Sequence, residues 1–178
     1  PPVVPMPKMI PNQVDKRQRA AAEVAQSLKL KNLESRLAAL LNNDEVDADT
    51  RAAAAKALAS INPVSHLSSF EKILNDSAAP ENLRDKTAGA LADINSADAR
   101  TILLDAIPNA PRKLQVQIAL SLASSAEGAN NLLASAENGK VSARLLQENS
   151  VDERLGATKD PAIKTRLEKL VAGLAPLS

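Results

Sequence analysis

Aromatic residues and cysteine are almost absent from this sequence. Cysteine, tryptophan and tyrosine do not occur, and Phe70 is the single phenylalanine. Without cysteine the chain cannot form disulfides or thiolate metal sites. Without aromatic rings it cannot stack nucleic-acid bases on its surface. Large rings cannot fill its core either. We therefore expect a core in which helices approach one another closely.

The sequence also lacks an excess of either charge and has no long apolar run. The 22 Lys and Arg and the 21 Asp and Glu residues give a net charge of +1, and the two signs are interspersed. A nucleic-acid surface would need clustered basic residues, and a membrane-spanning helix would need about 20 consecutive apolar residues. We therefore expect no nucleic-acid partner and no direct membrane insertion.

Alanine and leucine dominate what is present, with 33 and 25 of the 178 residues. Both are among the strongest helix formers. Breaks rich in Asn, Asp, Ser, Pro and Gly separate the apolar helical patterns, as helix ends require. They fall near residues 42–49, 62–63, 76–80, 95–97, 108–111, 124–128 and 138–141. The sequence therefore predicts an all-α fold.

The helical patterns repeat at a nearly constant offset. Residues 50–61, TRAAAAKALASI, align with residues 83–94, LRDKTAGALADI, and share the arginine, alanines, leucine and isoleucine of the pattern. Weaker copies lie at 16–28 and 115–124, and the intervening helices carry Leu41, Leu74 and Ile107 at the same offset. A fixed period of about 33 residues is typical of stacked helix pairs, whereas a single four-helix bundle gives no reason for the register.

Arg-x-x-Ala-Ala-x-Ala-Leu, the pattern at 51–58, resembles a HEAT-type repeat. The resemblance covers residues 15–138. It implies an α-α superhelix, a HEAT/armadillo-like solenoid of stacked helical hairpins. In such a stack each pair is too thin to be stable alone and gains stability from its neighbours.

The two ends of the chain differ from the repeats. Residues 1–14 are proline-rich, which favours polyproline II and predicts a linker or arm. An ordered arm packed on the first helices is the alternative. Residues 139–178 predict a helical cap leading to a following domain. Because the sequence begins with proline rather than Met, we expect a piece of a larger protein or a mature segment.

The tract 137–176, with Gly139-Lys140, ARLLQ, ERL and RLEKLVAGLAP, resembles a segment of large multidomain proteins of planctomycetes. Those proteins are described as membrane-bound dehydrogenases, and in them the segment precedes a haem-binding cytochrome c domain. The resemblance implies an exported parent oxidoreductase, located in the periplasm or at the cell envelope. This chain has no Cys-x-x-Cys-His motif, so any haem c would belong to another part of the parent.

Arg17, Arg51 and Arg84 occupy equivalent places in the repeats. A guanidinium fork suits carboxylates and carbonyls, so the three predict a structural ladder with one bond to a loop in each repeat. An anion-binding line is the alternative.

The acidic stretch 43–50 lacks the spacing of a calcium loop. It predicts instead that Asp47 or Asp49 caps the next helix. The sequence has no cysteine and no second histidine with which His66 could bind a metal, so His66 is expected near a helix start or on the surface. Gly89 is expected to allow a close contact between helices.

Serines and an aspartate predict three further helix starts. Ser65 is expected to cap the helix after Asn62-Pro63, Ser150 to cap another with Glu153 as its capping-box partner, and Asp160 to precede a helix that begins at Pro161 and ends near residue 173.

No residue is expected to be catalytic or to bind a cofactor or metal. The first hypothesis is therefore a non-catalytic scaffold, a spacer and docking surface between neighbouring domains of a redox protein. The second is a free-standing adaptor that binds a protein partner in a HEAT-repeat groove. A third, a cofactor-binding or enzymatic protein resembling phycobilin lyases, needs clustered polar groups in a pocket and is disfavoured by the composition.

Overall fold

The computed structural model describes residues 11–177, without the side chains of 11–15 and Gln26. Over these residues the chain is all-α, with no strand, which confirms the predicted all-α class. The chain divides into two compact units, one ending at Arg36 and the other beginning at Leu37.

The first unit is formed by most of helix α1, Pro11–Leu41. Helix formation from Pro11 shortens the expected arm, whose residues 1–10 lie outside the described part. The repeat copy at 16–28 and the predicted helix that carries Leu41 form one continuous helix instead. The reason is local: residues 29–32, Lys-Leu-Lys-Asn, contain neither glycine nor proline to interrupt it.

The second unit begins with the last turn of α1, where Leu41 is fully buried. The breaks between its helices fall within a few residues of those predicted. Its helices are α2 (Ala48–Ile61), α3 (Pro63–Asn75), α4 (Glu81–Ile94), α5 (Ala97–Ala106), α6 (Arg112–Leu122), α7 (Ala126–Glu137), α8 (Asn149–Gly156) and α9 (Pro161–Val171), with 3-10 turns η1 (Ile107–Asn109) and η2 (Ala143–Gln147).

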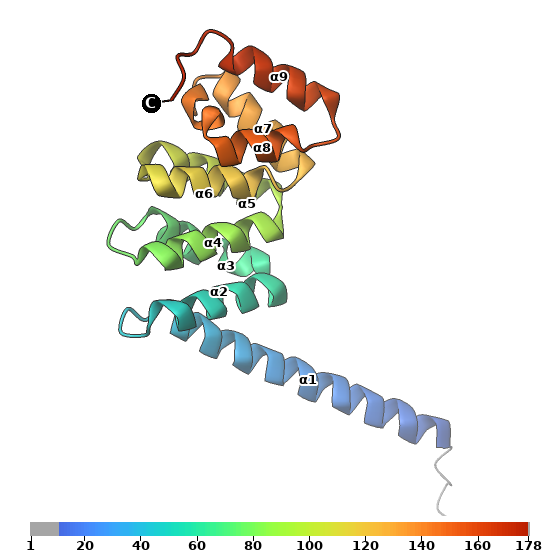
Figure 1. Ribbon diagram of the computed structural model, residues 1–178. Helices are drawn as coiled ribbons and strands as arrows, with labels where there is room; N and C mark the ends of the chain where they lie inside the picture. The colour runs from blue at the N-terminus through green and yellow to red at the C-terminus, as the bar shows by residue number, and fades with distance from the viewer. Residues whose placement is uncertain (1–10, 178) are drawn as a thin grey trace, which may run out of the picture. The chain divides into compact units, whose positions relative to one another are not determined.

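Helices α2 to α9 form two rows (Figure 1). In the first row α2 contacts α4, α4 contacts α6 and α6 contacts α8; in the second, α3, α5, α7 and α9 follow one another in the same way. Contacts between consecutive helices join the rows. The tract 139–178, which departs from the repeat in sequence, thus extends both rows by one helix each.

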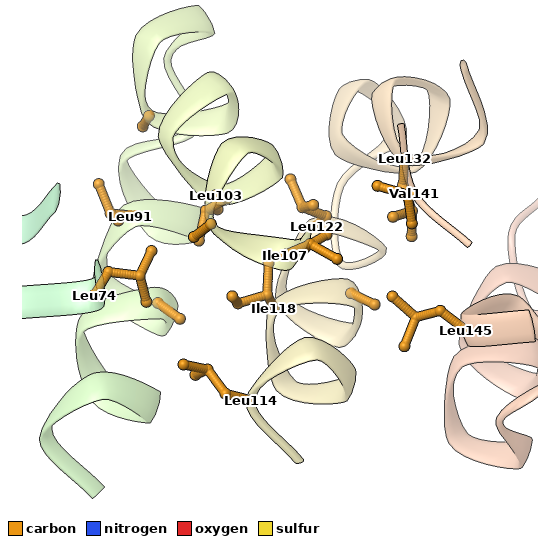
Figure 2. Packing of buried hydrophobic residues seen from close by; sticks show 14 of the residues in the cluster. Leu74, Leu91, Leu103, Ile107, Leu114, Ile118, Leu122, Leu132, Val141 and Leu145 are labelled. Atoms are coloured by element: carbon orange, nitrogen blue, oxygen red, sulfur yellow. The ribbon is translucent and has the colours of Figure 1, made fainter. Parts of the chain in front are cut away.

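Small and large apolar side chains alternate in the core between the rows. Ala55, Ala88 and Ala119 are completely buried at equivalent positions of α2, α4 and α6. The leucines one helical turn further along, Leu58, Leu91 and Leu122, are buried as well. Figure 2 shows Leu91 and Leu122 among side chains of both rows, so the core is continuous from layer to layer.

Polar contacts tie each layer to the next on the surface. Their partners lie 29 to 36 residues apart, close to the period of the sequence. In the first row these contacts join Asn82 to Asp49, Lys113 to Glu81 and Arg112 to Glu148, and in the second row Arg100 to Asn131, Lys140 to Asp105 and Arg166 to Glu137.

The predicted helix caps are confirmed where an aspartate precedes the helix. Asp47 accepts a 2.9 Å hydrogen bond from the Thr50 amide, and Asp160 accepts one of 2.9 Å from Ala162. The serine caps are wrong. α3 begins at Pro63, directly after Asn62, and α8 begins at Asn149, directly after Glu148, so Ser65 and Ser150 lie inside the first turns.

Candidate functional site

A hollow of about 240 Å³ opens on the first row, across α2, α4 and α6. Gly89 of α4 lies among its lining residues, and an added Cβ atom there would meet nothing within 4 Å. The expected close contact at Gly89 is therefore wrong: this glycine leaves space. The polar side chains of the hollow come from all three helices, namely Lys56, Asp85, Lys86, Asp93 and Gln117.

Asp85 is a charged residue of the hollow that has a buried oxygen without a hydrogen-bond partner in the described structure. Its side chain is partly buried, and the Oδ1 atom has no hydrogen-bond partner among the described residues. Burial raises the pKa of the Asp85 carboxyl, and the nearby Glu81 carboxylate raises it further. Lys113 opposes this shift but forms a 2.6 Å ion pair with Glu81 instead. The hollow thus contains a carboxylate that lacks a full set of donors.

The arginines predicted at equivalent places have two different environments. Arg51 donates from Nε to the Leu41 carbonyl at 2.9 Å, and Arg84 donates in the same way to Leu74 at 3.1 Å. Both are buried, with 6% and 7% exposure. Arg17 is exposed on α1. Arg51 and Arg84 each bind a backbone carbonyl, as the structural-ladder alternative describes. The anion-binding alternative stays a prediction.

Gln115 takes the corresponding place in the third layer, a position that the sequence analysis missed. Its Nε2 atom donates to the Ile107 carbonyl at 2.9 Å. The three acceptors, Leu41, Leu74 and Ile107, are the residues whose regular spacing is visible in sequence. In these three layers, therefore, a side chain of a first-row helix binds one carbonyl at or beside the end of the preceding helix.

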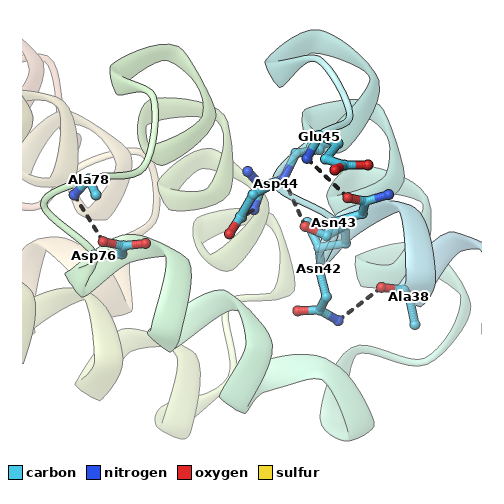
Figure 3. Close-up of polar contacts among 9 residues, drawn as sticks. Ala38, Asn42, Asn43, Asp44, Glu45, Asp76 and Ala78 are labelled. Atoms are coloured by element: carbon cyan, nitrogen blue, oxygen red, sulfur yellow. Dashed lines mark hydrogen bonds and ion pairs between the residues drawn. The ribbon is translucent and has the colours of Figure 1, made fainter.

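The acidic stretch 43–50 makes protein contacts (Figure 3). Asp44 pairs with Arg51 at 3.2 Å, and the Asn43 side chain accepts from the Glu45 amide. The Thr50 hydroxyl and amide both donate to Asp47, and they lower the pKa of its carboxyl. In the part of the chain that the structure describes, no three His, Cys, Asp or Glu residues come together in a group that could hold a metal ion.

His66 and Gly128 complete the comparison with the predicted positions. His66 lies in the first turn of α3, half-buried, close to the predicted helix start. The tight glycine is Gly128 rather than Gly89: a Cβ there would lie 2.1 Å from the Leu122 carbonyl oxygen. Gly128 is the third residue of α7, and its amide donates to the capping Ser125 hydroxyl at 3.0 Å.

Comparison with protein-family models, with curated proteins and with solved structures finds no match for this chain. Over the described residues, no helix has both the length and the apolar character that a membrane crossing requires.

Proposed function

We propose that this chain is a non-catalytic α-solenoid of the HEAT type that serves as a scaffold. The observation that carries the proposal is the recurrence of one geometry. Ala55, Ala88 and Ala119 are buried at equivalent positions, and a side chain bonded to a carbonyl near a helix end recurs in three layers. Stacked layers of this kind form an extended surface whose parts keep fixed positions.

In this proposal the scaffold is a spacer within a larger exported redox protein. It holds an upstream domain and a c-type cytochrome domain at a fixed separation, in the periplasm or at the cell envelope. Support for this parent comes from the resemblance of residues 137–176. The partners are neighbouring domains or another protein, and haem c belongs to the parent rather than to this segment.

A free-standing adaptor is the second candidate, and the hollow over Gly89 favours it. A row of helices with a polar depression offers a seat for a protein partner, which a pure spacer does not need. The coding sequence on both sides separates the two. A Cys-x-x-Cys-His motif shortly downstream supports the redox spacer, and a stop codon with no upstream domain supports the adaptor.

A distance measurement tests whether the proposed spacer is rigid. The chain has no cysteine of its own, so spin labels attach only at cysteines introduced for the purpose. Spin labels are placed at Glu45→Cys, before α2, and at Lys169→Cys, in α9. Both sites are exposed and both lie in the second unit. We expect one narrow distance distribution in pulsed electron paramagnetic resonance. A broad or multimodal distribution contradicts a spacer.

A further inference from the structure

We propose that residues 16–31 of α1 dock an amphipathic helix of a partner protein, whose apolar stripe lies between two acidic ends. This inference rests on the proposed scaffold function and names the kind of partner that the scaffold holds. It follows from three properties of this part of α1. These are an exposed apolar stripe, basic residues at both ends of that stripe, and a local excess of basic charge.

The apolar stripe is formed by Ala20, Val24 and Leu28. These residues follow one another at intervals of four, which places them on one face of the helix. Val24 and Leu28 have 60% and 57% of their surface accessible, and all three residues line a shallow hollow of about 450 Å³. Most of the stability of a helix in a protein comes from packing of its apolar face. A partner that covers the stripe would therefore stabilise α1.

Basic residues lie at both ends of the stripe. Arg17 and Lys31 are exposed, seven residues before and after Val24, and residues seven apart on a helix differ in direction by only about 20°. The two cations therefore lie on the same line as the apolar side chains, about 20 Å apart along the helix axis. A helix that lies on a membrane instead separates its basic residues from its apolar face. A partner helix with leucines at its centre and carboxylates at both ends matches this order.

The excess of basic charge is local. In the rest of the chain acidic residues outnumber basic ones, whereas residues 16–31 contain one acidic residue, Glu23, and five exposed basic residues, Lys16, Arg17, Arg19, Lys29 and Lys31. Glu23 balances Lys31 at the shallow hollow, and the other four basic residues stay unbalanced. Opposite potentials across an interface guide association and fix its register, so the charge favours an acidic partner. Nucleic acid is also anionic, but its phosphate backbone has no apolar stripe for Val24 and Leu28 to contact.

Fluorescence anisotropy with labelled peptides and the intact 178-residue chain tests the proposal. The main probe is a capped peptide of about five helical turns, with a central stripe of leucines and two glutamates at each end. One control peptide has lysines in place of the glutamates, and another has serines in place of the leucines. We expect saturable binding of the main probe, at least about tenfold tighter than that of either control, because each control removes charge-assisted contacts or apolar burial.

Charge reversal in the chain makes the test specific. The double variant Arg17→Glu with Lys31→Glu should reverse the preference, so that the lysine peptide binds more tightly than the glutamate peptide. The double variant Lys72→Glu with Lys159→Glu makes the same change in net charge at exposed sites of the second unit and should leave binding unchanged. Leu28→Ser should weaken binding of the main probe about tenfold, because it removes apolar contact area.

Several outcomes would overturn the inference. These are equal binding of the glutamate and lysine peptides, no binding of the glutamate peptide, or a preference that survives Arg17→Glu with Lys31→Glu. Tighter binding of phosphatidylserine vesicles or of duplex DNA than of the glutamate peptide would assign this face to a membrane or to nucleic acid, and would overturn it as well. If the peptides fail to bind while the distance between Glu45→Cys and Lys169→Cys remains narrowly distributed, the scaffold stands and only the docking face is wrong. A broad distance distribution contradicts the scaffold itself.

Discussion

Helices α1 and α2 carry the same pattern in successive repeats of the sequence and bury it differently. In α2, Arg51, Ala55 and Leu58 are all buried. In α1 the equivalent residues are exposed, and Val24, the counterpart of Leu58, has 60% of its surface accessible. The pattern therefore specifies a helix with one small-residue face. Burial of that face depends on neighbouring helices. α2 contacts two of them, α3 and α4.

The largest expected effect on stability distinguishes a buried leucine of α4 from an exposed valine of α1. Leu91→Ala removes a fully buried side chain of α4 and should lower the free energy of unfolding by about 2–5 kcal/mol. Val24→Ala removes exposed surface and should change it by less than about 0.5 kcal/mol. Urea denaturation measures both. Equal losses would mean that Val24 is covered as Leu91 is.

The next effect compares two glycines within the layers. Gly128→Ala forces a Cβ onto the Leu122 carbonyl, and we expect a loss of about 1–3 kcal/mol from overpacking. Gly89→Ala meets open space, and the better helix propensity of alanine should add up to about 1 kcal/mol. Thermal unfolding reports the two shifts, which should have opposite signs; shifts of the same sign would refute the hollow at Gly89.

The third effect compares two arginines of the predicted ladder. Arg84→Met leaves the Leu74 carbonyl without its side-chain donor and should destabilise the protein by about 1–3 kcal/mol. Arg17→Met, at the exposed equivalent in α1, should change stability by less than about 0.5 kcal/mol. Chemical denaturation of both variants is the measurement. A comparable loss from Arg17→Met would show that α1 anchors a layer as well.

The smallest effect concerns the ion pair between the last helices of the second row. Hydrogen bonds from Arg166 lower the pKa of Glu137 in the folded protein. Because the folded pKa is depressed, the pair stabilises the fold above the unfolded pKa of about 4.3, and this is lost as pH falls through the folded value. Glu137→Gln should remove that part of the pH dependence, with an effect smaller than that of Arg84→Met. Stability measured against pH should show the difference, and an unchanged profile would contradict it.

Sequence was sufficient for the all-α fold, the helix breaks from residue 42 onwards and the aspartate caps. Each depends on nearby residues: Asp47 and Asp160 accept from amides within the first turn of the helix that follows. The prediction for Gly89 was wrong because it depended on distant partners. Whether a helical glycine is tight or open depends on what lies opposite, which distinguishes Gly128 from Gly89. Gln115 escaped notice because it shares geometry, not residue type, with Arg51.

The contacts of α8 and α9 with the preceding helices of their rows could not be predicted from the sequence pattern, for a related reason. Its residues do not follow the Arg-Ala-Leu pattern, yet α8 contacts α6 and α9 contacts α7. Val151 and Ile163 supply the buried apolar surface that alanine and leucine supply elsewhere.

Hydrogen exchange of Ala88→Leu tests the central claim most directly, because Ala88 is completely buried in α4, which α2 and α6 both contact. If small side chains let the layers lie close, the larger side chain should reduce amide protection in α2 and α6 as well as in α4. Loss of protection confined to α4, or none, would contradict the account.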